Sequence, residues 1–109
     1  MMNTYRAIVY NVVDGDTIDV MIDLGFKLYT KQRIRLARID TPERGQPGFH
    51  EATNRMKNLL LDQNITLVTT KVSKWGYYVG DIYLNTIDIN QLMLSEGLAK
   101  PYLGEVKSS

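Results

Sequence analysis

Residues 33–43 read Arg33-Ile34-Arg35-Leu36-Ala37-Arg38-Ile39-Asp40-Thr41-Pro42-Glu43, and the rest of the chain is organised around them. Its apolar residues predict a strand, which must stop at Pro42 because proline lacks a backbone N–H and pushes Thr41 away from helical angles. Three arginines and two carboxylates in so short a segment could hold a cation and a phosphate side by side. The residues around Pro42 also suit an ordinary helix start, with proline in the first turn and an acid nearby.

Length and composition describe one ordinary globular domain. The chain has 109 residues, 44% of them hydrophobic, and its apolar runs are far shorter than the ~20 residues of a membrane-spanning helix. Without cysteine it has neither disulfides nor thiolate metal sites. Its net charge of +1 gives no sign of nucleic-acid binding, so any phosphate site must come from a local cluster.

The two ends of the chain carry expectations of their own. No basic segment followed by an apolar one opens the sequence, which predicts a cytoplasmic protein or one encoded on a mobile element. We expect one domain over residues 1–102. The polar end from Pro101 onward is expected to fray, with residues 103–109 forming a disordered tail.

Alternating residue types predict five short strands, over residues 5–13, 17–22, 26–39, 65–72 and 79–84. Asp14-Gly15 is a strong hairpin signal, and we expect the third strand to bend near residues 29–31. Helical spacing predicts a helix from Phe49 to Asp62, and a second, shorter helix runs from Asp88 to Gly97. This order predicts an α+β fold, the five-stranded Greek-key barrel of the OB-fold with two packed helices.

Two aspartates are expected to meet at one end of this barrel. Asp16 begins the second strand and Asp40 ends the third, and these positions face each other in an antiparallel pair. Carboxylates of this kind suit Ca²⁺ or Mg²⁺, which take hard oxygen ligands. Without a cation, Asp16, Asp40 and Glu43 would crowd like charges together. The alternative is that Asp14-Gly15-Asp16-Thr17 is only a turn.

Five short motifs follow one another along the chain: Val13-Asp14-Gly15-Asp16-Thr17, Arg35 through Asp40-Thr41-Pro42-Glu43, Glu51-Ala52, Lys74-Trp75-Gly76 and Glu96-Gly97-Leu98-Ala99-Lys100. In this order and spacing they resemble the staphylococcal nuclease family, and the resemblance extends from about residue 5 to residue 102. The family's fold is an OB-fold barrel with packed helices, in agreement with the fold predicted from the residue patterns.

The resemblance implies a Ca²⁺-dependent nuclease and assigns a role to each matching residue. Asp16 and Asp40 look like the carboxylate ligands of Ca²⁺, with the backbone carbonyl of Thr41 as a third ligand and Asp14 in the outer shell. Glu43 resembles the general base that activates or positions the attacking water. Arg35 resembles an arginine that grips the scissile phosphate, a role that suits the planar fork of guanidinium donors.

The motif Lys74-Trp75-Gly76 resembles a nucleotide-binding turn. Lys74 would contact phosphate and Trp75 a base or sugar, whose stacking is tolerant of sequence and favours single-stranded or unstacked DNA or RNA. A partly buried surface aromatic is the alternative for Trp75. The chain departs from the family at Tyr77, where a second catalytic arginine is usual, because a phenol donates a hydrogen bond but brings no positive charge.

Other cations could replace that arginine. Arg44, after Glu43, and Arg55, on the first helix, are the candidates to reach the site. Arg33 shares the strand face of Arg35, whereas Arg38 is expected to point the other way and to be structural. Two further interpretations stay open: a noncatalytic OB-fold module that binds nucleic acid, and a protein–protein interaction domain. The near-neutral charge and Tyr77 favour them, while Asp16, Arg35, Asp40 and Glu43 favour the enzyme.

Overall fold

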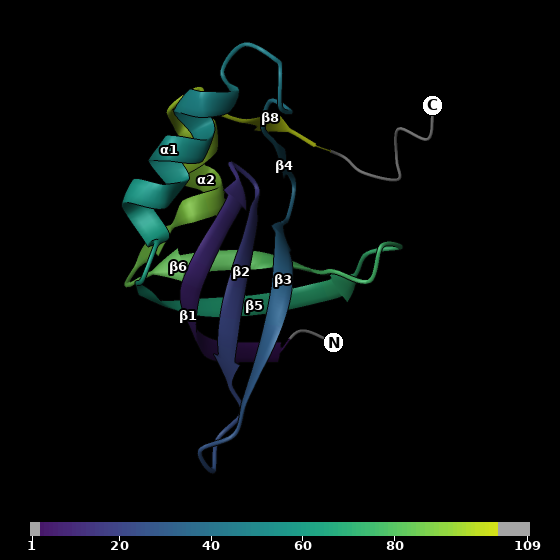
Figure 1. Ribbon diagram of the computed structural model, residues 1–109, viewed down its shortest axis with the longest axis vertical. Coiled ribbons are helices and arrows are strands. Elements are labelled where there is room, and N and C mark those ends of the chain that lie inside the picture. The colour runs from purple at the N-terminus through teal and green to yellow at the C-terminus, as the bar shows by residue number, and fades with distance from the viewer. Residues whose placement is uncertain (1–2, 103–109) are drawn as a thin grey trace.

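Alternating inward and outward residues build a closed barrel in the computed structural model, which describes residues 3–102. Its long strands are β1 (Asn3–Asp14), β2 (Thr17–Asp23), β3 (Tyr29–Leu36), β5 (Asn64–Val72) and β6 (Tyr78–Leu84). Neighbours pair antiparallel in the order β3-β2-β1-β5-β6, and a parallel pairing of β3 with β6 closes the barrel (Figure 1). The predicted OB-fold barrel is confirmed.

The inward residues of all five strands form one core. Its fully buried members, with 0% exposure, include Val9, Ile18, Val20, Ile34, Leu67 and Ile82. Because successive side chains of a strand point to opposite faces, the residues between them point outward and are free to carry charge.

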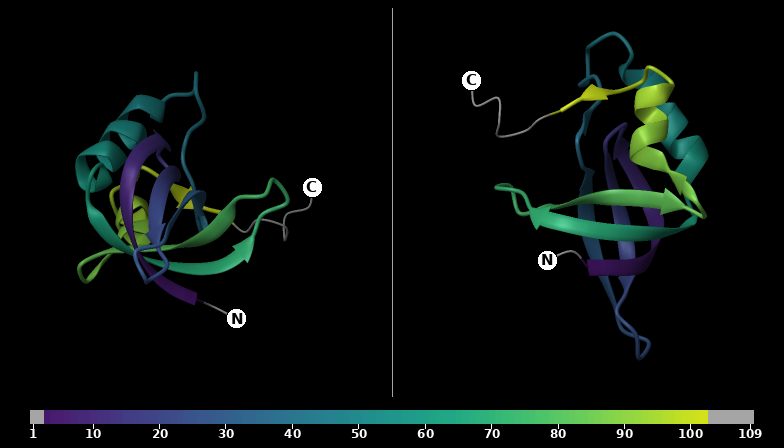
Figure 2. Two further views of the ribbon diagram at one scale, coloured as in Figure 1. Left: turned by 60° about the horizontal axis from the view of Figure 1, so that its bottom comes forward. Right: turned by 180° about the vertical axis from the view of Figure 1, so that it is seen from behind.

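Two helices lie side by side at one end of the barrel (Figure 2). Helix α1 (Phe49–Leu60) buries a stripe that includes Ala52, Met56 and Leu60, as its spacing predicts. Helix α2 (Ile89–Ser95) follows the two-residue strand β7 (Ile87–Asp88). The side chain of Asp88 accepts a hydrogen bond from the amide of Gln91, so the predicted N-cap is confirmed.

The third predicted strand, over residues 26–39, is wrong at both ends. Phe26 and Lys27 have φ values of 54° and 62° and form the tip of the β2–β3 hairpin. Residues 29–31 pair in continuous register with β2, so the expected bend is absent from β3. The strand ends at Leu36 because the chain turns at Arg38, which has a φ of 65°, and Asp40 lies in a separate strand, β4 (Ile39–Asp40).

The end of the described chain is ordered, contrary to the fraying expected from Pro101. Strand β8 (Lys100–Pro101) pairs antiparallel with β4, and the amide of Tyr102 donates to the carbonyl oxygen of Arg38 at 2.9 Å. The predicted tail, residues 103–109, lies outside the described residues. Across residues 3–102, neither helix has the length and apolar character to cross a membrane.

Candidate active site

A groove of about 670 Å³ lies where the ends of β3, β4 and β8 meet the β5–β6 hairpin. All eight residues predicted to form the site line this groove: Asp16, Arg35, Asp40, Thr41, Glu43, Lys74, Trp75 and Tyr77. They come from turns and strand ends that are distant in sequence. The barrel therefore brings together the complete predicted set in one place.

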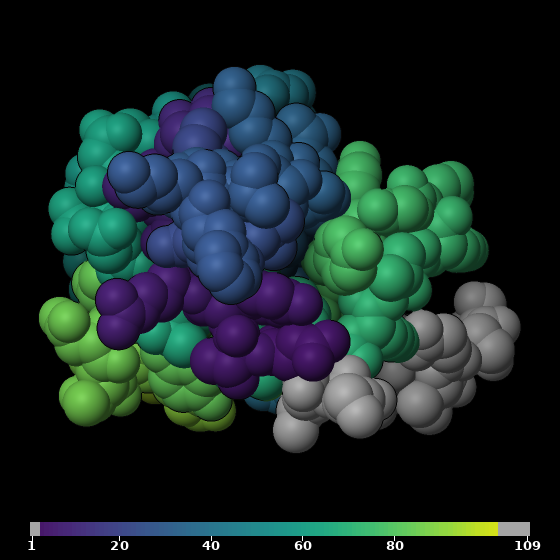
Figure 3. Space-filling model, turned by 90° about the horizontal axis from the view of Figure 1, so that it is seen from below, coloured from purple at the N-terminus to yellow at the C-terminus, as the bar shows by residue number. Residues whose placement is uncertain are grey.

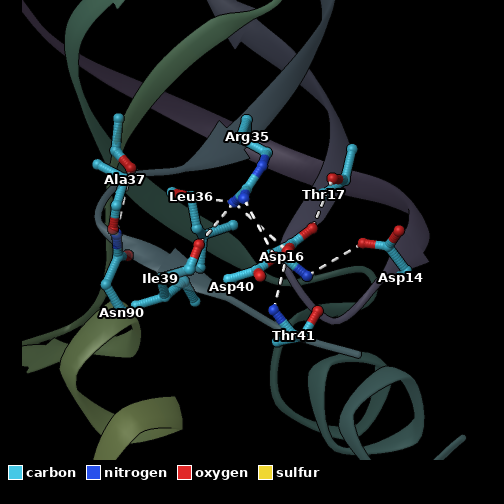
Figure 4. Close-up of polar contacts among 11 residues, drawn as sticks. Asp14, Asp16, Thr17, Arg35, Leu36, Ala37, Ile39, Asp40, Thr41 and Asn90 are labelled. Atoms are coloured by element: carbon cyan, nitrogen blue, oxygen red, sulfur yellow. Dashed lines mark hydrogen bonds and ion pairs between the residues drawn. The ribbon is translucent and has the colours of Figure 1, made fainter. Parts of the chain in front are cut away.

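Arg35 is at the centre of the polar contacts in the groove (Figure 4). Its Nη1 donates to the carbonyl oxygens of Leu36 and Ile39 at 3.0 and 2.9 Å. The same guanidinium lies 3.4 Å from Asp16 Oδ2 and 3.7 Å from Asp40 Oδ1. These contacts fix the direction of the side chain while 23% of it stays exposed to the groove.

Asp16 is a buried carboxylate with a defined orientation. It lies in the β1–β2 turn and is 7% exposed. Its Oδ2 accepts a hydrogen bond from the amide of Thr41 at 3.0 Å, and its Oδ1 accepts one from the hydroxyl of Thr17 at 2.9 Å. One side chain thus connects the first hairpin to the segment after β4, which places Asp16 beside Asp40 as predicted.

Asp14 stands close enough to Asp16 for the two carboxylates to influence each other. Burial, together with the neighbouring side chain and charge of Asp16, raises the pKa of Asp14 to about 6. Its Oδ1 accepts a hydrogen bond from the amide of Asp16 at 3.1 Å, which opposes that rise. Negative charge is therefore concentrated at this end of the groove, where the guanidinium of Arg35 lies 3.4 Å from Asp16.

The donor set at this end fits a hard divalent cation. Asp16 and Asp40 contact the same guanidinium and so lie near each other, and the backbone of Thr41 follows directly. The hydroxyl of Thr41 is buried without a hydrogen-bond partner, so a further oxygen atom is available beside the two carboxylates. Within residues 3–102 no group of three acidic or histidine side chains is close enough to hold a metal ion, so carbonyl oxygen and water would complete the shell.

Glu43 lines the same groove from an exposed loop. Its backbone amide donates to Oε1 of Gln46 at 2.7 Å, and the amide of Gln46 donates back to the carbonyl oxygen of Glu43 at 2.9 Å. This reciprocal pair shapes the loop through the backbone of Glu43 and leaves its carboxylate outside these two hydrogen bonds. Within residues 3–102, Asp16, Asp40 and Glu43 do not together form a group that could hold a metal ion.

The facing wall of the groove belongs to the β5–β6 hairpin. The hydroxyl of Ser73 accepts hydrogen bonds from the amides of Trp75 and Tyr77 at 3.2 and 3.1 Å, which fixes the tight turn. Trp75 is 72% exposed, and the ammonium of Lys74 lies 5.2 Å from the centre of its ring. A flat aromatic surface next to a cation is thus presented to the groove.

Tyr77 stands where the family usually has an arginine, and its ring lies next to the guanidinium of Arg33. The guanidinium of Arg33 lies 5.8 Å from the centre of the Tyr77 ring, and hydrogen bonding to Asp19 and then to Tyr77 raises the pKa of Arg33. The two proposed substitutes lie elsewhere. Arg55 binds Glu96 through two nitrogens at 2.8 Å, and Arg44 lies 5.0 Å from the ring centre of Phe49, and neither lines the groove.

Arg38 does not follow the alternation that was expected of it. Because β3 ends at Leu36, Arg38 occupies a turn, where it lines the groove and pairs with Asp81 at 2.7 Å. It is therefore a groove residue as well as a structural one.

Two residues that shape the site were not predicted from the sequence. Tyr102 lies over Arg35, with 5.3 Å between the guanidinium carbon and the ring centre. An aromatic residue soon after the Leu98-Ala99-Lys100 motif was the available signal, but it fell in the segment expected to fray. Asn90, 2% exposed, donates to the carbonyl oxygen of Ala37 and so holds the turn after β3 (Figure 4). Nothing in the sequence distinguishes it from a surface asparagine.

Comparison with known proteins adds independent information. A family model described as "Staphylococcal nuclease homologue" matches residues 33–108. The chain is 32% identical over 107 residues to a micrococcal nuclease of Shigella flexneri, covering 90% of this chain and 59% of that protein. An uncharacterized endonuclease of Escherichia coli O157:H7 is 34% identical over 95 residues, covering 86% of this chain and 59% of that protein.

A plant protein is similar as well. Staphylococcal-like nuclease CAN1 of Arabidopsis thaliana is 34% identical over 76 residues, which cover 70% of this chain and 24% of that protein. The chain spans 59% of the length of the two bacterial relatives. The region matched by the family model contains Arg35, Asp40, Glu43 and the Lys74-Trp75 turn, together with both helices, β5 and β6, whereas β1, β2 and Asp16 precede it. This chain belongs to the staphylococcal nuclease family.

Proposed function

We propose that the protein is a Ca²⁺-dependent nuclease that hydrolyses phosphodiester bonds of DNA or RNA. The observation that carries this proposal is the convergence of Arg35, Asp16 and Asp40 at one end of a groove. A positioned guanidinium beside two carboxylates suits a phosphate bound together with a cation. The bacterial relatives named as a nuclease and an endonuclease support the class of reaction.

Arg35 would bind the scissile phosphate. Its Nη1 donates to two backbone carbonyls, and Asp16 and Asp40 lie 3.4 and 3.7 Å from the guanidinium, so the group is held in place before a phosphate binds. Donors fixed in advance stabilise the negative charge that grows on the phosphate oxygens during attack, and removing one such donor typically slows a reaction by about a hundred- to a thousandfold.

Glu43 would act on the attacking water. Its exposed carboxylate lines the groove, where it can accept a proton as the water oxygen bonds to phosphorus. The bond from phosphorus to the leaving oxygen then breaks, and that oxygen takes a proton from solvent. The products are one phosphate monoester and one hydroxyl, so no other reactant is needed.

Asp16, Asp40 and the carbonyl of Thr41 are the residues that would hold Ca²⁺. The ion, when bound, supplies positive charge to the phosphate oxygens. Asp16 is the most constrained of the three, because the amide of Thr41 and the hydroxyl of Thr17 both bind its carboxylate. Asp40 has the more exposed carboxylate, at 36%.

Lys74 and Trp75 would bind the terminal nucleotide on the facing wall. The exposed indole offers a stacking surface to any base, worth roughly 1–3 kcal/mol per stacked base. Such stacking requires an unpaired base, so we expect the protein to prefer single-stranded or unstacked DNA and RNA over intact duplex.

A gel assay tests the proposal. Heat-denatured DNA is incubated with the protein and Ca²⁺, with and without excess chelator, and Glu43→Gln is the control for contaminating nucleases. Degradation by the wild type that both the chelator and Glu43→Gln abolish is expected. Degradation that persists in Glu43→Gln, or none in the wild type, would overturn the assignment.

Tyr77 favours one alternative, a noncatalytic module that binds nucleic acid in the same groove. A phenol supplies no charge at the position where the family usually has a second arginine. In the same gel assay this module would shift the mobility of the DNA without degrading it. A protein–protein interaction domain would produce neither degradation nor a shift.

A further inference from the structure

The outer face of β3 carries a row of cations that leads away from the groove. Arg35, Arg33 and Lys31 alternate with inward residues, so all three point to the same outer side of the barrel. Only Arg35 lines the groove itself, and Tyr77 links the two regions because it lines the groove and contacts Arg33. The row therefore continues the charged surface of the groove along the strand.

Each cation of this row lies beside a tyrosine from a different element. The distances from the charged atom to the ring centre are 5.3 Å for Arg35 and Tyr102, 5.8 Å for Arg33 and Tyr77, and 5.3 Å for Lys31 and Tyr10. Tyr10 and Tyr102 are 41% and 43% exposed, so both residues are accessible to a ligand on the outer face. Cations interleaved with exposed rings are the surface that single-stranded nucleic acid binds.

The spacing of the row matches such a ligand. Alternate residues of a strand lie roughly 7 Å apart, the order of the distance between successive phosphates of an extended nucleic-acid strand. We propose that Arg33 and Lys31 bind consecutive backbone phosphates of a single strand that continues beyond the phosphate held by Arg35. This inference rests on the proposed function and adds to it an extended binding site for single-stranded DNA or RNA.

One carboxylate opposes this binding. Asp19 on β2 faces Arg33 and accepts hydrogen bonds from its Nε and Nη2 at 2.7 and 3.1 Å. The pair leaves Nη1 outside the contact, and 40% of the Arg33 side chain is exposed. Farther along β2, Met21 lies opposite Lys31 and brings no charge. Asp19 therefore weakens the attraction of the row for phosphate without covering it.

The three cations Arg35, Arg33 and Lys31 lie where a nucleic-acid strand that leaves the groove could reach them. Seen from below, the β2–β3 hairpin projects toward the viewer, and the β5–β6 hairpin that carries Tyr77 stands beside it (Figure 3). A nucleic-acid strand that leaves the groove past Tyr77 would follow the outer face of β3 toward Tyr29, which is 59% exposed. Only surface residues of the barrel would take part in this contact with the nucleic acid.

The test compares a dinucleotide with a single-stranded oligonucleotide of about ten nucleotides, a length within the usual range of such sites. Affinity is measured by fluorescence anisotropy in excess chelator, where no cleavage interferes. The variants are Arg33→Gln, Lys31→Gln and Asp19→Asn. Lys57→Gln, which removes the same charge from an exposed position on α1, is the matched control. Thermal melts confirm that each variant is folded.

We expect Arg33→Gln and Lys31→Gln to weaken binding of the long oligonucleotide by about three- to tenfold, and to lower the slope of log affinity against log salt by roughly 0.7 each. The dinucleotide should be affected far less. Asp19→Asn should strengthen binding of the long oligonucleotide, because it releases Arg33 from its partner. A merely structural role of the Arg33–Asp19 pair would instead make Asp19→Asn neutral or harmful.

Equal effects of Lys31→Gln and Lys57→Gln would overturn the extended site, as would equal losses for short and long oligonucleotides. Cleavage assays in Ca²⁺ keep this failure distinct from failure of the proposed function. A wild type that cuts DNA while Arg33→Gln and Lys31→Gln bind the long oligonucleotide normally would reject the extended site alone. A wild type that neither cuts nor binds nucleic acid would reject both.

Discussion

Asn90 donates its side-chain amide to the carbonyl oxygen of Ala37 at 2.9 Å, which ties helix α2 to the turn that ends β3. The same side chain accepts a hydrogen bond from the amide of Ile82 at 3.1 Å and is 2% exposed. Through this contact the helix supports the turn between Arg35 and Asp40. A residue that does not itself line the groove thus supports the turn on which the groove's polar residues lie.

Asn90→Leu should therefore destabilise the protein. The substitution leaves buried backbone groups at residues 37 and 82 without partners, which costs about 2–4 kcal/mol of the free energy of unfolding. For a domain of this size the melting temperature should fall by roughly 10–20 °C. Asn54→Leu, at an exposed position on α1, is the control and should change little. A similar melting temperature for both variants would show that the Asn90 contacts contribute no stability.

Asp19 should make stability dependent on pH. Its hydrogen bonds to Arg33 lower the pKa of its carboxyl group in the folded state. The stabilisation by the Asp19–Arg33 pair is thus complete above the pKa of the Asp19 carboxyl group in the unfolded chain, roughly 4. It is lost as the pH falls through the lower pKa of the same group in the folded state. Asp19→Asn should be less stable than wild type at pH 7, and the difference should shrink in acid. Denaturant unfolding at several pH values measures this, and a constant difference would contradict it.

Calcium should stabilise the folded state. Binding to the native state alone adds about 2.7 kcal/mol to the free energy of unfolding at a hundredfold excess over Kd, or roughly 10–20 °C in melting temperature. Asp40→Ala should abolish this shift and still fold, because Asp40 is partly exposed. Glu51→Gln, on α1, should keep it. An unchanged wild-type melting temperature at several millimolar Ca²⁺, on the order of the weakest protein sites, would argue against a tight site.

Tyr77→Arg should raise kcat if a second guanidinium is what the groove lacks. One added arginine can be worth roughly a thousandfold in phosphoryl transfer. Since Tyr77 is not among the proposed metal ligands, the calcium-induced shift in melting temperature should stay the same. Tyr77→Phe is the matched control, because it removes the hydroxyl without adding charge.

Two outcomes would reject that explanation of Tyr77. A rapid wild type that Tyr77→Arg leaves unchanged would mean that the missing charge is already supplied by another residue. Activities of Arg44→Ala and Arg55→Ala then identify the source, although neither arginine lines the groove in the structure. An inactive wild type that stays inactive with Tyr77→Arg would favour the binding module.

Gly15→Ala should disturb the first hairpin. A Cβ at this position would lie 2.8 Å from Cβ of Ala52 and 2.8 Å from the hydroxyl of Thr41. Overpacking of this kind costs about 1–3 kcal/mol. Ala52→Gly makes room on the helix side, so the double variant should lose less stability than the sum of the single losses, measured by denaturant unfolding. Strict additivity would mean that the backbone absorbs the clash elsewhere.

Residue patterns predicted the barrel well because the alternation of residue types in each strand indicates which face is buried. The alternation around Ile18 and Ile34, the hairpin signal at Asp14-Gly15 and the cap at Asp88 are local features, and each is confirmed. The strand boundary at Leu36 was missed because Ala37 and Ile39 continue the apolar pattern. The turn at Arg38 is held by partners on β6 and α2, which a local reading cannot see.

The site was predictable in its membership and less so in its contacts. The motifs led to eight of the residues that line the groove, but not to Arg38 or Tyr102, which line it as well. The pairing of Arg33 with Tyr77 depends on strands that are distant in sequence and meet only when the barrel closes. The position of Tyr102 over Arg35 likewise requires β8 to pair with β4. Both contacts arise from tertiary structure.

The parallel pairing of β3 with β6 has a consequence for folding. It joins Ile34 to Tyr78, whereas β1, β2 and β3 are linked by short hairpins that form between neighbours in sequence. Long-range pairings of this kind form late, because more chain entropy is lost in bringing the strands together. The groove spans this seam, with Arg35 on one side and Tyr77 on the other. A chain in which only the hairpins have formed therefore has no groove, and ligand binding requires the closed barrel.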